Sequence, residues 1–383
     1  MSDASRQPNP GTGLLGPRYA RRNQLGATAD IEGGGRWVAV DESGWDGDQL
    51  HGEQRSRYLS IGSVAISDAD AEPIVDEIRS ATRLQAPELK FSGVFAGPKN
   101  GQRRSVLSAL LAPGGALHER ASVYLLDKHY FVVAKLIDLF VEEQAHKQGS
   151  NFRNAGDARK MARSLFEEGP RALGPALFGR LLASTVAFTS QRNRDQQVTV
   201  DDFYEVVEEA WARSCRRNVT EALALLRTTQ EEAVEFLQAA HGPDAAIPQA
   251  LEPLIPAVAA VTANWSRKLG RVNMLVDDQR TLSDENLDDI EAEARDRGYP
   301  EFRHLSRGVH LGQLRRGQST QHPSLQLADL IAGAGFAVAQ RHHGLANPAG
   351  EDLHPVVVPL IDVAGMLPHD EPARVAQPTP PVT

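Results

Sequence analysis

The chain of 383 residues has a formal net charge of −9, and its 24% charged and 41% hydrophobic residues are ordinary proportions for a globular protein. The acidic balance argues against a protein that coats nucleic acid with its whole surface, but not against a local basic channel beside an acidic site. Cys215 is the single cysteine, no apolar run reaches the roughly 18 residues that cross a bilayer, and the beginning of the chain has no apolar signal region. We therefore expect a cytoplasmic protein with no membrane partner and no intrachain disulfide bond.

The first part of the chain predicts a disordered tail followed by a sheet with helices on it. Residues 1–34 are rich in Gly, Pro, Asn and Arg without apolar periodicity, which is typical of a disordered tail. Short apolar runs predict strands at 37–40, 58–66 and 121–126, and apolar residues at helical spacing follow at 68–83 and at 132–140. Residues 35–141 are therefore assigned to the first part of an α/β core.

The middle of the chain changes to almost purely helical spacing. Residues 142–268 have this pattern, and we expect a helical insertion of the size of a small domain. A strand pattern returns at 271–276, then a helix that begins at Thr281 or Ser283 and runs to about residue 297, a strand near 309–311, and a final helix from 325 to about 342. Residues 269–345 are assigned to the second part of the core, and 346–383 to a C-terminal extension that is mostly disordered.

Three acidic residues occupy similar positions in these predicted elements. Asp41 ends the first strand, Asp277 ends the strand that follows the insertion, and Asp329 lies inside the final helix. Carboxylates in such places are rarely buried without a partner, and three of them repel one another unless a cation neutralises them. Mg²⁺ or Mn²⁺ is the natural cation for such a group, because both prefer oxygen ligands.

The helix around Asp329 is consistent with a site. Gln326 and Gly333 lie on the same face as Asp329, and the small residues Ala332 and Gly333 allow a sheet or a ligand to approach closely. An acid that is simply favoured by the helix dipole is the alternative. From this helix alone both interpretations remain open.

Several short motifs follow one another in a distinctive order. They are DESG at 41–44, ELKFS at 88–92, DK at 127–128, VDD at 276–278, and QLADLIAG at 326–333 with Ser319 before it. In this set and order, from about residue 36 to 343, the chain resembles the bacterial family called domain of unknown function 3800. The resemblance implies a ribonuclease H-like mixed sheet with flanking helices, and a metal-dependent nuclease or phosphoryl-transfer activity. Asp41, Asp277 and Asp329 would then be the main catalytic carboxylates and metal ligands.

The same fold usually has a further acid on its first core helix, and its position here is open. Glu42 and Glu88 are candidates, and Asp278 could supplement Asp277. Glu42 should point to the opposite side of the strand from Asp41, which makes it a surface charge or a supporting residue. Whether one or two metal ions bind is open for the same reason.

Basic and polar residues near these acids have plausible roles and ordinary alternatives. Lys90, Arg315 and Arg316 could bind phosphates, although most lysines are simply solvated. Asp127 could be a fourth carboxylate, but we favour a helix N-cap, with Lys128 near the cap or on the surface. Ser319 is either a site residue or an ordinary loop serine.

Two functions of different classes follow. The first is a Mg²⁺- or Mn²⁺-dependent nuclease that acts on DNA or RNA, with phosphates held by Lys90, Arg315 and Arg316. The second is a non-catalytic nucleic-acid-binding or partner-binding module on the same fold. The preserved trio of acids favours the first.

Overall fold

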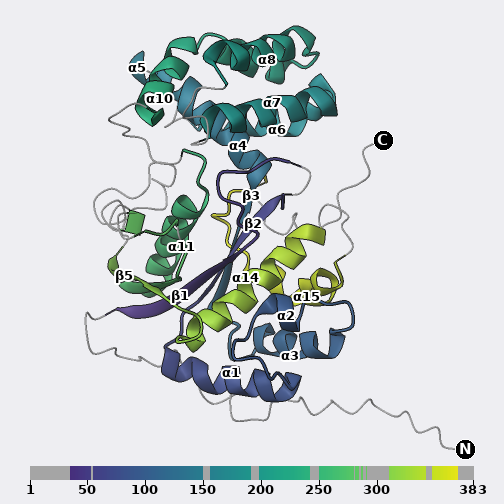
Figure 1. Cartoon of the computed structure of the whole chain (residues 1–383), viewed down its shortest axis with the longest axis vertical. Helices are drawn as coiled ribbons and strands as arrows, with labels where there is room; N and C mark the ends of the chain where they lie inside the picture. The colour runs from purple at the N-terminus through teal and green to yellow at the C-terminus, as the bar shows by residue number, and fades with distance from the viewer. Residues whose placement is uncertain are drawn as a thin grey trace, which may run out of the picture.

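A five-stranded mixed sheet forms the centre of the computed structural model (Figure 1). The structure describes residues 35–52, 55–149, 156–190, 198–241, 250–279, 281–283, 286–287, 290, 310–341 and 347–369. The strands are β1 (Arg36–Ser43), β2 (Tyr58–Val64), β3 (Ala121–Asp127), β4 (Val272–Asp277) and β5 (Leu311–Gly317). Their order is β3-β2-β1-β4-β5, in which β2 is antiparallel to β1 and β3, and β4 is parallel to β1 and β5. The predicted α/β core with a mixed sheet and flanking helices is confirmed.

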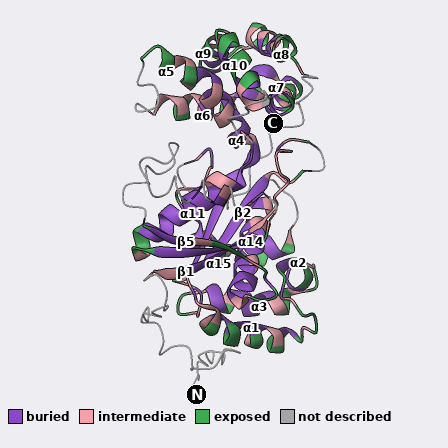
Figure 2. Cartoon of the chain, turned by 60° about the vertical axis from the view of Figure 1, so that its left-hand side comes forward, coloured by how far each residue is buried: buried purple, intermediate pink, exposed green. Residues whose placement is uncertain are grey.

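Both faces of the sheet are covered, and this explains why its strands are continuous apolar runs rather than alternating ones. In β1, Val38 and Val40 belong to the core on one face, whereas Ala39 belongs to the core on the other. Figure 2 shows that burial is concentrated in the sheet and in the helices on it, while the outer helices of the molecule carry the exposed residues.

One face is covered by α14 (Pro323–Arg341), with α1 (Asp68–Thr82), α2 (Phe91–Val94), α3 (Gly101–Leu111) and α15 (Pro348–Val357) around it. The backbone of α14 lies almost on the backbone of β2, because a Cβ atom on Gly62 would overlap the amide nitrogen of Ala332 and the carbonyl oxygen of Ala328. Gly333 likewise leaves room for the ring of Phe91. The close approach predicted from the small residues of this helix is therefore confirmed.

A helical lobe stands beyond one end of the sheet (Figure 1). The helix α4 (Lys128–Leu136) leads into it through a π-helical segment (Ile137–Glu142). The lobe contains α5 (Glu143–Lys147), α6 (Asp157–Leu173), α7 (Pro175–Thr189), α8 (Val200–Arg213), α9 (Arg217–Leu226) and α10 (Gln230–His241). Within the described part of 142–268 every regular element is helical, as predicted.

The boundary of the predicted insertion at residue 268 needs a correction. The helix α11 (Leu254–Leu269) belongs to the core, since it packs on the face of the sheet opposite α14. Trp265 Nε1 donates to Ser63 Oγ of β2 at 2.8 Å. Every residue from 257 to 266 is buried, and a helix that is buried all round is typical of a core. Helical spacing alone could not separate this helix from the lobe.

The C-terminal extension also needs a correction, because 347–369 are ordered. After α15 a short 3₁₀ helix (Val358–Leu360) leads to Ile361, which bridges Val123 of β3, and Met366 bridges Leu126. Apolar side chains such as Leu353 and Val357 are buried in the core under α14, which explains the order. The predicted tail at 1–34, the remaining part of the C-terminal extension at 370–383, most of the predicted helix at 283–297 and the segment 302–309 lie outside the described residues. None of the helices in the described part could span a membrane.

Candidate functional site

The ends of two neighbouring parallel strands bring Asp41 and Asp277 together. Val40 of β1 lies opposite Val276 of β4, so the next residue of each strand is its Asp. Alternation along a strand places each Asp on the same face as the residue two before it. Those residues, Ala39 and Leu275, belong to the core under α14, so both carboxyl groups face the helix that carries Asp329.

The three predicted acids influence one another electrostatically. Asp41 is only 7% exposed, and burial raises its pKa well above the usual range, with further increases from Glu42, Asp329 and Asp277. Burial raises the pKa of Asp329 to about 6, although a hydrogen bond of 2.6 Å from Phe91 N–H to its Oδ2 acts in the opposite direction. The pKa of Asp277 is raised by burial as well. Asp41 and Asp277 therefore lie side by side near the ends of β1 and β4, and Asp329 is close enough to influence Asp41.

Glu42 is closer to these acids than its sequence position indicated. It is half-buried, and burial together with the charge of Asp277 raises its pKa to about 7. Gln279 Nε2 donates to Glu42 Oε1, and Glu42 N–H donates to Asp41 Oδ1 at 2.7 Å. Of the two alternatives for Glu42, a surface charge or a supporting residue, its partial burial and its hydrogen bond from Gln279 favour the supporting residue.

A loop between α1 and α2 adds Glu88 and Lys90 to the same site. Lys90 Nζ lies 3.2 Å from Glu88 Oε1, and Ser319 Oγ donates to the same oxygen. Burial opposes a charged Lys90, but Glu88, Asp329 and Asp41 together raise its pKa. Lys90 thus stands beside the acids, with its side chain half exposed.

Gln326 of α14 binds the loop that carries Glu88 and Lys90 through hydrogen bonds. Its Oε1 accepts from Leu89 N–H at 3.0 Å, and its Nε2 donates to the carbonyl oxygen of Ser319 at 2.8 Å. Gln326 lies one helical turn before Asp329, so both side chains extend from the same side of α14. The helix therefore sets the positions of the Glu88 loop and the Ser319 loop along with its own carboxylate.

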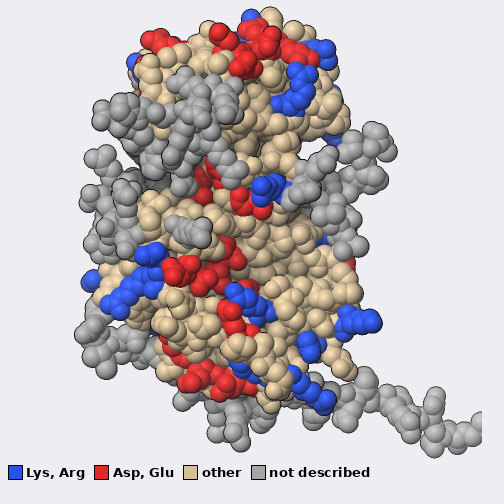
Figure 3. All heavy atoms as spheres, viewed as in Figure 1, with Lys and Arg blue, Asp and Glu red and all other residues tan. Residues whose placement is uncertain are grey.

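The other predicted residues lie at the edge of the sheet. Asp278 is exposed and lies 3.5 Å from Arg316 Nη1, which favours Asp277 over Asp278 as the site residue. Arg315 is also exposed, and its guanidinium group lies over the Trp37 ring at 5.5 Å. Figure 3 shows an acidic band across the middle of one face of the molecule, with Lys and Arg side chains on both sides of it.

Asp127 is a helix cap, as favoured from the sequence. Its Oδ1 accepts from the backbone N–H groups of His129 and Tyr130 at 3.0 and 3.2 Å, and its Oδ2 accepts from Arg57. The Arg57 guanidinium and the capping N–H groups outweigh the effect of burial and lower the pKa of Asp127. It is not a fourth carboxylate of the site.

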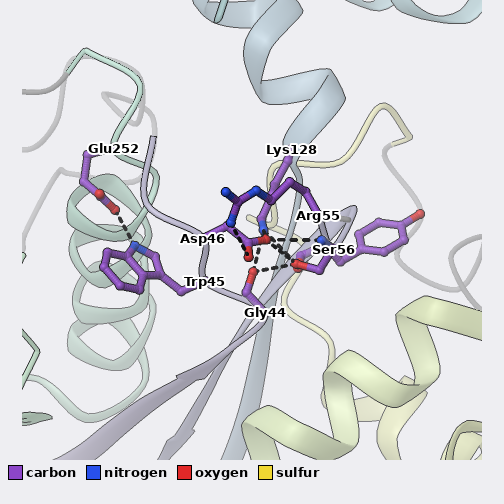
Figure 4. A network of polar contacts seen from close by, with 8 residues as sticks. Gly44, Trp45, Asp46, Arg55, Ser56, Lys128 and Glu252 are labelled. Carbon is purple, nitrogen blue, oxygen red and sulfur yellow. Dashed lines mark hydrogen bonds and ion pairs between the residues drawn. The ribbon is translucent and has the colours of Figure 1, made fainter. Parts of the chain in front are cut away.

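Lys128, expected near the cap or on the surface, is completely buried. Its ammonium group donates to the carbonyl oxygen of Gly44 at 2.5 Å, to Asp46 Oδ2 at 2.5 Å and to Ser56 Oγ at 2.7 Å (Figure 4). Gly44 has φ +83°, and a Cβ atom there would overlap the ring of Phe336. The turn at Gly44, the last residue of the DESG motif, is therefore held by Lys128 on one side and packed against Phe336 on the other. Nothing in the local sequence around Lys128 indicates these partners.

The same turn is joined to the helices beyond it. Trp45 Nε1 donates to Glu252 Oε1 at 2.9 Å just before α11, and Ser190 Oγ at the end of α7 donates to Asp48 Oδ2 at 2.6 Å (Figure 4 shows the first of these). The segment that leaves β1 is thus held by Lys128 of α4, by the residue that follows α7 and by a residue just before α11.

The donor chemistry of the site fits Mg²⁺ or Mn²⁺, which prefer carboxylate oxygens. Its raised pKa values mean that a nearby cation would stabilise the ionised forms. In the described residues no three acidic, histidine or cysteine side chains are placed so that they could hold one ion as they stand. Mg²⁺ usually keeps several waters and needs only one or two protein carboxylates, so a closed cage is not required.

No family model, curated protein or solved structure matches the chain. The interpretation of the site therefore depends on its residues and their geometry.

Proposed function

We propose that the chain is a Mg²⁺- or Mn²⁺-dependent nuclease of ribonuclease H-like fold. The observation that carries the proposal is that two adjacent parallel strands and one helix bring Asp41, Asp277 and Asp329 to the same side of the sheet, with Asp41 buried and the other two partly buried. A mixed sheet followed by a late helix that bears an acid is the plan expected for that fold, and the observed order of elements supports it.

In this proposal each side chain of the site has a defined task. Asp41, Asp277 and Asp329 hold the cation, and Glu42 and Glu88 add negative charge around it. The bound cation would supply Lewis acidity and lower the pKa of a water molecule. Lys90, half exposed beside the acids, holds the phosphate that is cleaved.

In this proposal, basic residues at the edge of the sheet bind the nucleic acid on either side of the cleaved phosphate. Arg315 and Arg316 are exposed on β5, the strand next to the one that ends in Asp277. Contacts to phosphates position a strand without reading its bases. The substrate class that follows is a nucleic acid bound through its backbone.

A non-catalytic nucleic-acid-binding module is the second candidate. It is favoured by one observation, that no three potential ligands among the described residues are placed to hold an ion as they stand. Asp41 is buried at the end of a strand pair that also places Asp277, and a bound cation would offset the repulsion between these carboxylates, which favours the enzyme.

The deciding experiment is a cleavage assay on single- and double-stranded DNA and RNA with Mg²⁺, Mn²⁺ or EDTA. Asp41→Asn and Asp329→Asn should each lower the rate by at least about two orders of magnitude, because they remove a ligand and part of the charge that holds the cation. Asp76→Asn on the exposed side of α1 is the matched control and should cleave as the wild type does. Nucleic-acid binding without cleavage by the wild type would select the non-catalytic module instead.

A further inference from the structure

A tryptophan and an arginine form a partly exposed pair on the face of the sheet that carries the site. The guanidinium carbon of Arg315 lies 5.5 Å from the centre of the Trp37 ring. Trp37 packs at the margin of the core under α14, and Arg315 is the register partner of Leu275, which belongs to the same core. The two side chains therefore meet on the α14 side of the sheet, from β1 and β5, across the intervening strand β4.

The pair lies a short way along the sheet from the carboxylates. Trp37 is four residues before Asp41 on β1, and Arg315 is level with Leu275, two residues before Asp277 on β4. At about 3.3 Å per residue, these intervals correspond to about 13 and 7 Å. Both are even numbers of residues, so the side chains point to the same face as the acids. One strand of nucleic acid could therefore contact the pair and the site together.

The neighbouring arginine extends from the other face. Arg316 is the register partner of Val276, which belongs to the core on the α11 side, and its Nη1 lies 3.5 Å from Asp278 Oδ1. Of the two arginines at this edge of the sheet, Arg315 is thus the one that faces the site.

The Trp37 ring keeps an accessible surface. In the lobe the guanidinium carbon of Arg227 lies 3.7 Å from the centre of the Trp211 ring, in direct contact, whereas Arg315 is farther from Trp37. Trp37 is half-buried and Arg315 is exposed although β1 is an interior strand, so the described helices do not cover this pair completely. It offers the face of an aromatic ring beside a positive charge. Every nucleotide has a base with a π face and a negative phosphate, and this chemistry complements both.

We propose that Trp37 and Arg315 bind an unpaired nucleotide beside the site, so that the substrate is single-stranded, an inference that rests on the proposed nuclease function. The base stacks on the Trp37 ring, and the Arg315 guanidinium contacts the phosphate. In a duplex each base is already stacked between its neighbours, so a ring on the surface of a sheet has no base face to contact. Stacking reads no base edge, and the pair therefore selects strand form rather than sequence.

The test is the binding of labelled single strands and duplexes of DNA and of RNA to the full-length protein, measured by fluorescence anisotropy in EDTA to prevent metal-dependent cleavage. Trp37→Ala should weaken binding of single strands about 5- to 150-fold, the range for the loss of one aromatic–base stack, and leave duplex binding unchanged. Trp37→Phe retains a ring and should restore most of the affinity. Arg315→Ala should weaken single-strand binding and lower its salt dependence by about one released counterion.

The matched control is Trp211→Ala. Trp211 is also half-buried beside an arginine, but it lies on α8 in the lobe, and its loss should leave binding of single strands as in the wild type. If circular dichroism shows that Trp37→Ala does not fold, Trp37→Leu replaces it in the same assays, because leucine keeps an apolar side chain without a ring.

The outcomes separate this inference from the nuclease function. Unchanged single-strand binding after loss of the Trp37 ring, or an equal loss on duplexes, would overturn the stacking role. A wild type that binds single strands through Trp37 but never cleaves with Mn²⁺ would refute the nuclease function and leave the stacking role in place. A wild type that cleaves, with a Trp37→Ala variant that binds as well as it does, would refute the stacking role alone, and a wild type that binds neither form would refute both.

Discussion

Lys128→Met should destabilise the protein although it lies outside the candidate site. The substitution keeps much of the apolar stem but removes an ammonium group that is completely buried and has three oxygen acceptors within 2.7 Å. Breaking a buried ion pair from one side costs about 3–5 kcal/mol of stability, because the remaining charge stays in place without a partner.

The structure indicates the lower end of that range. The Asp46 side chain is 20% exposed, and Arg55 remains within 3.6 Å of its other oxygen. The carbonyl oxygen of Gly44 still accepts from Ser56 Oγ at 2.8 Å. We therefore expect a loss of about 3 kcal/mol for Lys128→Met. Adding Asp46→Asn should cost less than the sum of the two single changes, because the unpaired charge is then absent.

Urea denaturation followed by circular dichroism measures these losses. The matched control is Lys135→Met in the same helix, where the lysine forms an i,i+3 pair of 3.1 Å with Asp138, and its cost should stay below about 1 kcal/mol. Equal losses for Lys128→Met and Lys135→Met would refute the reasoning, since they would mean that burial of the ammonium group makes no difference.

Two further predictions concern the site and its support. The pKa of Asp329 is raised to about 6 in the folded protein, and that of Glu42 to about 7. The folded protein therefore keeps protons that the unfolded chain releases near pH 4. The metal-free protein should for this reason lose stability as the pH rises from about 4 to 7. Thermal unfolding in EDTA measures this loss, Mn²⁺ should reduce it, and a melting temperature that stays constant over this range would contradict it. Gly62→Ala should cost about 2–3 kcal/mol or more in urea denaturation, because its Cβ atom meets the backbone of Ala332. Gly93→Ala, with nothing within 4 Å of the new atom, should be nearly neutral, and equal costs would argue against this close contact.

The three acids could be singled out in the sequence because each has a local signature. Asp41 and Asp277 directly follow apolar runs, and Asp329 stands in a helix of small and apolar residues. Their meeting follows from strand pairing and alternation, which obey simple rules. The choice of Asp277 over Asp278 came from the same reasoning, and the exposure of Asp278 agrees with it.

Other features could not be read from the sequence, since they depend on contacts between distant segments. Lys128 looks like any lysine at a helix start, and its partners come from a turn without periodic pattern. Glu42 is covered by Gln279, which lies 237 residues away. The core helix α11 has the same apolar spacing as the lobe, so only its burial on the sheet reveals where it belongs.

The pairing of β1 with β4 has a consequence for the time at which the site forms during synthesis. Asp41 leaves the ribosome early, but its strand neighbour Asp277 and the helix with Asp329 come only after the whole helical lobe. At about 5–20 residues per second, this delay is on the order of ten seconds to a minute. During that interval the β4-facing edge of β1 has no partner, and the nascent chain has only one of the three acids. A nascent chain that stops before residue 323 would therefore lack the acid of α14, so the site cannot be complete until this helix has been made.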